Sequence, residues 1–253
     1  FSALCLFGAG VAIASGNSGN QTHVLDYTFR DSKQETDENL DMNTVKKELE
    51  AAGLASQFSK ILQIKVGKPK EHESVSFEKF IKVLKEQKES KNKEVLVHNF
   101  QKYISCHLLP LSEYNELRKA ASLPPLELTN KEAYLYMGKD FLPDENLVNS
   151  VLKTNPQIKV MGNDVKLIGE VQSLPIVTDR EITISVALIV PDETFMSYTD
   201  GRYSNYVSGI LAPELVKEKG LMKAISDTNK KLNQSPLGYE SYIQNMGRQL
   251  FYI

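Results

Sequence analysis

Histidine and cysteine side chains are the residues of this sequence that could carry acid–base, nucleophilic or metal chemistry. The four histidines, His23, His72, His98 and His107, are scattered and lack the regular spacing that is typical of a metal site. Cys106 and His107 are adjacent, and adjacent residues of a strand point to opposite faces, so they cannot form a nucleophile–base pair. We interpret them as a core cysteine beside a solvated histidine, and we predict no catalytic residue, no metal ligand and no cofactor.

The motifs of the common enzyme classes are missing from the sequence. It contains no phosphate-binding glycine loop, no HExxH zinc motif and no GxSxG nucleophile motif. Only Cys106 lies in the polar body of the chain, so no internal disulfide framework is available, and the net charge of −2 excludes a strongly basic nucleic-acid binder. Lys159 and Lys166 in a predicted hairpin, and the loop 200–203, are exposed polar features that we interpret as plain turns.

Two apolar segments flank this polar body. Residues 1–15 carry no charge and resemble the last part of a membrane helix, and residues 239–253 become more apolar and Tyr-rich, which suits a membrane–water interface. A spanning helix needs about 20 apolar residues, so neither segment spans a bilayer by itself. We interpret the body as a large extramembrane loop of a polytopic membrane protein. Two alternatives remain open: a secreted protein with a signal peptide cleaved after Ala14, and a soluble protein with a buried apolar hairpin.

The domain organisation follows from this interpretation. We expect an α+β fold in which mixed sheets are flanked by helices in two lobes, with truncated membrane-helix stubs at both ends. The expected segments are the end of a membrane helix at 1–15, a first extracellular lobe at 16–140, a second extracellular lobe at 141–238, and the start of the returning membrane helix at 239–253.

Hydrophobic spacing predicts the elements of the body. Strands are expected at 24–30, 58–66, 95–111, 126–129, 133–137, 158–161, 165–168 and 182–190. Helices are expected at 42–52, 76–89, 112–121, 143–153, 213–219 and 221–232, with Asp41 or Asn43 capping the first and Ser112 capping the third. The helix at 76–89 is amphipathic and rich in lysine, so it either packs on the sheet or docks on anionic lipid headgroups.

A weak internal repeat links two of these regions. Residues 104–114 and 184–195 each contain a strand that ends at proline, then a polar cap, then an aromatic residue four positions after the proline. Proline stops the sheet ladder and starts a helix, so Tyr114 and Phe195 should pack back on their strands.

Taken in order, these elements resemble the large extracellular domain of FtsX-like ABC transporter permeases, and among them the bacitracin- and lantibiotic-resistance (BceB-type) permeases of Firmicutes. The resemblance rests on Leu25-Asp-Tyr-Thr-Phe29 after a polar hinge, on the units at Pro110–Asn115 and Pro191–Phe195, on the strand pair at 126–128 and 134–136, and on the exit at 239–253.

What the resemblance implies is a ligand-binding or sensing domain of a permease involved in export of, or resistance to, antimicrobial peptides. The domain would face the outside of the cell membrane of a Gram-positive bacterium and contact a peptide antibiotic or a lipid-linked cell-wall precursor. Its partners would be a separate ATP-binding ABC subunit, which hydrolyses ATP, and a sensor histidine kinase, without nucleic acid. The alternatives are a permease loop that transmits force to a cell-wall or lipoprotein partner, and a secreted protein with a cleaved signal peptide.

Overall fold

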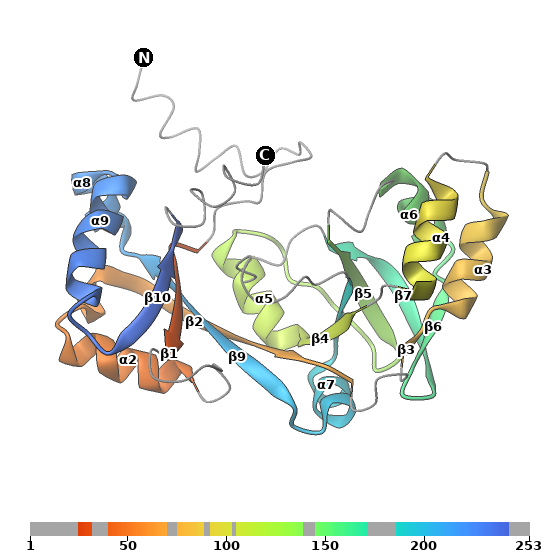
Figure 1. Ribbon diagram of the computed structural model, residues 1–253, viewed down its shortest axis with the longest axis horizontal. Coiled ribbons are helices and arrows are strands. Elements are labelled where there is room, and N and C mark those ends of the chain that lie inside the picture. Colours follow the sequence, from red (N-terminus) through yellow and green to blue (C-terminus); the bar gives the residue numbers. More distant parts are fainter. Residues whose placement is uncertain are drawn as a thin grey trace, which may run out of the picture.

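The computed structural model describes residues 25–31, 40–69, 75–88, 92–102, 105–138, 145–171 and 186–242. In these ranges the chain forms one mixed sheet of ten strands with eight α-helices packed against it (Figure 1). The expected α+β class, with a mixed sheet flanked by helices, is therefore confirmed. Residues 1–15 and 243–253, where membrane-helix stubs are expected, lie outside the described residues, and no helix in the described ranges is long and apolar enough to cross a bilayer.

The strands lie in the sheet in the order β10-β1-β9-β2-β4-β8-β5-β7-β6-β3. Their bounds are β1 Tyr27–Asp31, β2 Phe58–Gly67, β3 Val75–Ser76, β4 Cys106–Pro110, β5 Glu132–Met137, β6 Gln157–Val160, β7 Asn163–Val171, β8 Val186–Val190, β9 Tyr203–Leu211 and β10 Leu237–Ser241. Only the pairs β4–β8 and β5–β7 are parallel, and all the others are antiparallel.

The helices are α2 Met42–Ala51, α3 Glu78–Glu86, α4 Lys93–Lys102, α5 Leu111–Ala120, α6 Glu145–Leu152, α7 Asp192–Thr199, α8 Pro213–Lys219 and α9 Leu221–Leu232, and a 3₁₀ turn follows α2 at Ala55–Gln57. The strand order places the chain in two nested groups. The outer unit (residues 25–67 and 203–242) holds β1, β2, β9 and β10 with α2, α8 and α9, and the inner unit (residues 75–190) holds the remaining strands with α3 to α6. The predicted boundary between lobes, at residues 140 and 141, falls outside the described residues, and strands from both sides of it are interleaved in the sheet.

Three apolar clusters hold the sheet and its helices together. One joins α2 and α9 to the strands of the outer unit, and one joins α3, α4, α6 and α7 to those of the inner unit. The third lies on the opposite face at the centre, where Ile64 and Val66 of β2 meet Leu109 and Ile189 of the inner unit. Because β2 and β4 pair at a single register position, Gly67 and Leu108, this third cluster is a main contact between the two units.

Most predicted elements are present because their local signals are strong. Asp41 caps α2 by accepting a hydrogen bond from the Thr44 amide at 2.7 Å, and Val45 and Leu49 bury the inner face of that helix. The hairpin of β6 and β7 turns at Met161 and Gly162, which both have left-handed backbone angles, φ 50° and 77°. The helices predicted at 213–219 and 221–232 are found with those bounds.

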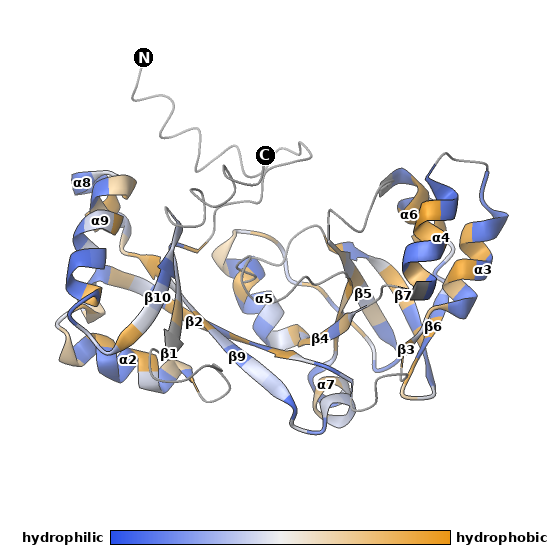
Figure 2. Ribbon diagram, in the orientation of Figure 1, coloured by the Kyte–Doolittle hydropathy of each residue, from blue (hydrophilic) through white to orange (hydrophobic). Residues whose placement is uncertain are grey.

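The helix predicted at 76–89 is α3, and its apolar side lies in the core. Phe80, Ile81 and Leu84 are buried, as the packing interpretation of this helix expects. Figure 2 shows the mixed hydrophobic and hydrophilic residues along α3 and α9, two helices that bury one side and expose the other.

Four local predictions were wrong. Most of the stretch 95–111 is not strand, because Leu96 and Phe100, four residues apart, place α4 on the core. Ser112 does not cap α5, which begins after Pro110 without a side-chain cap. Residues 126–129 form no strand. The Asn115 side chain accepts a hydrogen bond from the Leu126 amide at 2.8 Å and donates one to the Leu126 carbonyl at 2.9 Å, so it takes the place of a neighbouring strand. The first three residues of the segment 239–253 belong to β10 and not to a helix.

The strand–proline–helix repeat is visible at the centre of the sheet. β4 and β8 are parallel neighbours, and α5 and α7 follow them. Pro110 lies opposite Val190, so Pro191 is one residue further along its strand than Pro110 is. Because successive residues of a strand point to opposite faces, α5 and α7 start on opposite faces of the sheet. Tyr114 accordingly packs in the central cluster and Phe195 in the cluster of the inner unit.

Candidate functional site

The described surface is hollowed between α3 and α4. Two adjoining cavities of about 370 and 520 Å³ share Lys85 and Gln101 and form one open trough, which we call the α3–α4 groove. Its walls and floor are residues Val75, Ser76, Phe77, Glu78, Ile81, Lys82, Lys85, Lys93, Glu94, Val97, His98, Phe100 and Gln101.

Aromatic side chains form the floor of the α3–α4 groove. The ring centroid of Phe100 lies 5.1 Å from that of Phe77 and 4.7 Å from that of Phe80. Phe77 and Phe100 line the groove and are 4% exposed, and Phe80 is fully buried behind them, so the floor is part of the core of the inner unit.

The lysines around the groove have different roles. Lys93 is buried, and its ammonium group donates to the carbonyl oxygens of Lys85 and Gln87 at 3.4 and 3.2 Å, which satisfies the open end of α3. Lys82 and Lys85 are exposed, and their ammonium groups make no hydrogen bond or ion pair with the described residues. Two available cations beside an aromatic floor favour a ligand that has both an apolar part and an anionic group.

Cys106 and His107 lie on β4 with their side chains on opposite faces, as predicted, but the histidine is not solvated. Only 2% of the His107 surface is exposed, and neither ring nitrogen has a hydrogen-bond partner among the described residues. Burial, and secondly the charge of Lys68, lowers the pKa of His107 to about 4, despite an opposing effect of the Ser105 backbone. Burial also raises the pKa of the Cys106 thiol to about 12, so it is a poor nucleophile at neutral pH.

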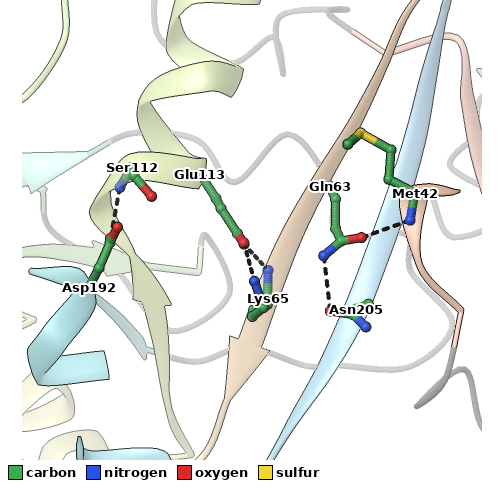
Figure 3. Close-up of polar contacts among 7 residues, drawn as sticks. All are labelled: Met42, Gln63, Lys65, Ser112, Glu113, Asp192 and Asn205. Carbon is green, nitrogen blue, oxygen red and sulfur yellow. Dashed lines mark hydrogen bonds and ion pairs between the residues drawn. The ribbon is translucent and has the colours of Figure 1, made fainter. Parts of the chain in front are cut away.

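The polar contacts near the centre of the sheet bind structural elements to one another (Figure 3). Glu113 of α5 accepts from the Lys65 amide at 2.6 Å and forms an ion pair with the Lys65 ammonium group, on an edge of β2 that β4 leaves uncovered. Asp192 of α7 accepts from the Ser112 amide at 3.0 Å, which joins the starts of α5 and α7. Each acceptor is used within the fold, so these residues do not form a ligand site.

A second set in Figure 3 fastens α2 to the long strands. Gln63 of β2 accepts from the Met42 amide at 2.8 Å and donates to Asn205 of β9 at 3.3 Å. The Gln63 side chain therefore complements the cap that Asp41 provides at the start of α2.

The exposed loops noted in the sequence have structural roles. Asp200 and Gly201 adopt left-handed backbone angles that end α7, and the Lys65 ammonium group lies 5.7 Å from the centre of the Tyr203 ring. Lys159 lies on β6 opposite Ser76, and the Lys166 amide donates to Lys131. In the described ranges, no three histidine, cysteine, aspartate or glutamate side chains gather as a metal site.

The groove was not predicted because α4 was mistaken for a strand. β-branched residues favour strands, and the Val95 and Val97 pair suggested one. The spacing of Leu96 and Phe100 was the helical signal that could have located this wall of the groove.

The comparisons with known proteins give no family. No protein-family model matches the chain, and no curated protein matches it.

Proposed function

We propose that this chain is the extracellular ligand-binding or sensing domain of an FtsX-like ABC transporter permease, involved in export of, or resistance to, antimicrobial peptides. The domain lies between two membrane segments on the outer face of a Gram-positive cell. ATP hydrolysis takes place on a separate ABC subunit, and a sensor histidine kinase is a further partner in signalling.

One observation carries the placement between two membrane segments. β1 and β10 pair antiparallel, with Tyr27 opposite Ser241, and the Tyr242 amide donates to the Asp26 carbonyl at 2.9 Å. The two apolar flanks, residues 1–15 and the segment after Tyr242, are therefore joined to the fold at adjacent points. Adjacent ends suit a domain that stands between two neighbouring membrane helices, and this supports the proposed placement.

The α3–α4 groove is the proposed ligand site. It combines the aromatic floor of Phe77 and Phe100 with the available ammonium groups of Lys82 and Lys85. The groove belongs to the inner unit, whereas the flanks are joined to the outer unit, so ligand binding and membrane attachment use different parts of the sheet.

Protease treatment of intact cells that express the full-length protein tests the placement. Peptides from residues 25–242 should be released while both flanks stay with the membrane fraction. Recovery of the whole chain from the medium, starting at Ser15, would instead support the secreted alternative.

The ligand site is tested by charge reversal in the groove. Cells with the K82E/K85E variant should lose several-fold of their protection against peptide antibiotics, because both available cations become anions. The K230E/K231E variant is a matched control, since Lys230 and Lys231 are exposed in the last turn of α9, outside the groove. Equal protection in wild type and both variants, at equal surface expression, would exclude the groove as the site.

A further inference from the structure

The corner between α8 and α9 presents an apolar apex to solvent. α8 ends at Gly220, whose left-handed φ of 78° turns the chain directly into α9. Met222, the second residue of α9, is 51% exposed, whereas Leu221 beside it packs against the apolar cluster of the outer unit. A single exposed methionine is ordinary on a protein surface, so the position of this corner decides its meaning.

Hydrogen bonds fix the position of α9 along the direction of strands β1 and β10. The Tyr27 hydroxyl donates to the Ile225 carbonyl at 3.0 Å and contacts the Asn229 side-chain oxygen at 2.7 Å, and Asn229 donates to Ser241 at 3.4 Å. The middle of α9 therefore lies level with the first residue of β1 and the last residue of β10. Met222 precedes Ile225 by almost one turn, so the apex extends roughly 5 Å past these strand ends, at 1.5 Å per residue.

Figure 1 shows the same relation: α8 and the adjoining part of α9 lie on the upper side of the picture, where β10 ends, and α7 lies on the lower side. The corner thus projects on the side where both apolar flanks are joined to the fold.

Lysines stand beside the apex. Lys219 and Lys223 share one carboxylate, that of Asp227, at 3.3 and 3.4 Å. The exposed carboxylates of Glu214 and Glu218 lie on α8, so the corner as a whole is close to neutral. The long apolar stems of Lys219 and Lys223 let their ammonium groups reach phosphates at a lipid surface while Met222 enters the interface.

We infer that the α8–α9 corner rests on the lipid headgroup layer of the bilayer and holds the domain at a fixed tilt above the membrane. This inference rests on the proposed placement between two membrane segments. The occupant is the lipid surface itself, because the corner lies on the flank side, with the exposed Met222 side chain at its tip and the stems of Lys219 and Lys223 beside it.

The absence of tryptophan from the sequence permits a direct test. The full-length protein, with both membrane segments complete and any tryptophan outside residues 1–253 replaced, is reconstituted as the M222W variant. The vesicles contain phosphatidylcholine and phosphatidylglycerol whose acyl chains carry bromine, which quenches nearby tryptophan. The control is M196W, because Met196 is equally exposed, at 50%, and belongs to α7, which lies on the lower side of Figure 1, away from the end of β10. We expect several-fold stronger quenching and a blue-shifted emission for the M222W variant only.

The outcomes separate this inference from the proposed function. If the chain floats with the vesicles after an alkaline wash but the M222W and M196W variants are quenched equally, or neither is quenched, the corner does not touch the bilayer and the inference is wrong. If the chain does not float at all, the placement between membrane segments fails, and the inference fails with it.

Discussion

At the scale of single residues, His107 is the least expected group in the molecule. A histidine on a strand usually faces solvent or has a partner. The ring of His107 is instead buried on the central strand β4, and neither of its nitrogens bonds to any part of the chain that the structure describes. Its neutral form is the one that the fold accommodates, since burial and the nearby charge of Lys68 both disfavour the imidazolium.

This burial predicts a pH-dependent stability. The folded-state pKa of His107, about 4, is below the ordinary value of 6.5, so the unfolded chain binds more protons between these two values. The stabilisation that comes from burying His107 in its neutral form is fully present above pH 6.5. It is lost as the pH falls to about 4, which lowers the free energy of unfolding by about 3 kcal/mol. Urea unfolding at a series of pH values measures this loss.

The H107L variant is the control for the pH effect. Leucine fills the site without a titratable group, so the free energy of unfolding should vary less over the same pH range. An unchanged pH profile in H107L would show that other groups cause the loss.

At the scale of elements, the close approach of α7 to β2 depends on Gly67. A Cβ atom at this position would lie 2.4 Å from the Thr199 methyl carbon and 3.2 Å from the Arg202 carbonyl oxygen. Gly67 also forms the single register pair between β2 and β4, so displacement here disturbs the contact between the outer and inner units.

The G67A variant should therefore lose about 1 to 3 kcal/mol of unfolding free energy, the usual cost of overpacking. The G67A/T199S double variant should recover part of that loss, because serine removes the clashing methyl group and keeps the hydroxyl that donates to the Phe195 carbonyl at 2.9 Å. Thermal unfolding of the three proteins gives the comparison, and a double variant no more stable than G67A would rule out this clash as the cause.

The elements that the sequence predicts well are those whose signals are local. The hairpin of β6 and β7, predicted from the strands at 158–161 and 165–168, and the capped helix α2 fall into this class, although the turn lies one residue earlier, at Met161 and Gly162. Hydrophobic periodicity does not report two other features. The Asn115 side chain bonds Leu126 in place of a neighbouring strand, and β4 pairs with β8, which lies far from it in the sequence. The groove could be predicted only in part, because one of its walls, α3, was predicted as a helix and the other, α4, was not.

At the scale of the whole molecule, the central cluster couples the outer unit to the inner unit. Leu109 is fully buried there among side chains of both units, whereas Leu49 is buried in the cluster of the outer unit alone. The two residues allow the coupling to be measured with substitutions of equal chemistry.

The L109A variant should lose about 2 to 5 kcal/mol, as buried leucines do on truncation. Amide hydrogen exchange should then accelerate in both units, because the cavity lies between them. In the L49A variant, acceleration should be greater in the outer unit than in the inner one. Faster exchange confined to the inner unit in L109A would contradict this coupling.

The register of β2 and β9 has a consequence for how such a chain can change over generations. These strands pair along their whole length up to Gly67 opposite Tyr203, so they form a hairpin whose connecting turn has been replaced by the inner unit and α7. Hairpin tips are positions where insertions are tolerated. Segments can be gained, lost or exchanged at this tip, and the recognition surface can thus diversify while the framework that joins the two flanks is inherited intact.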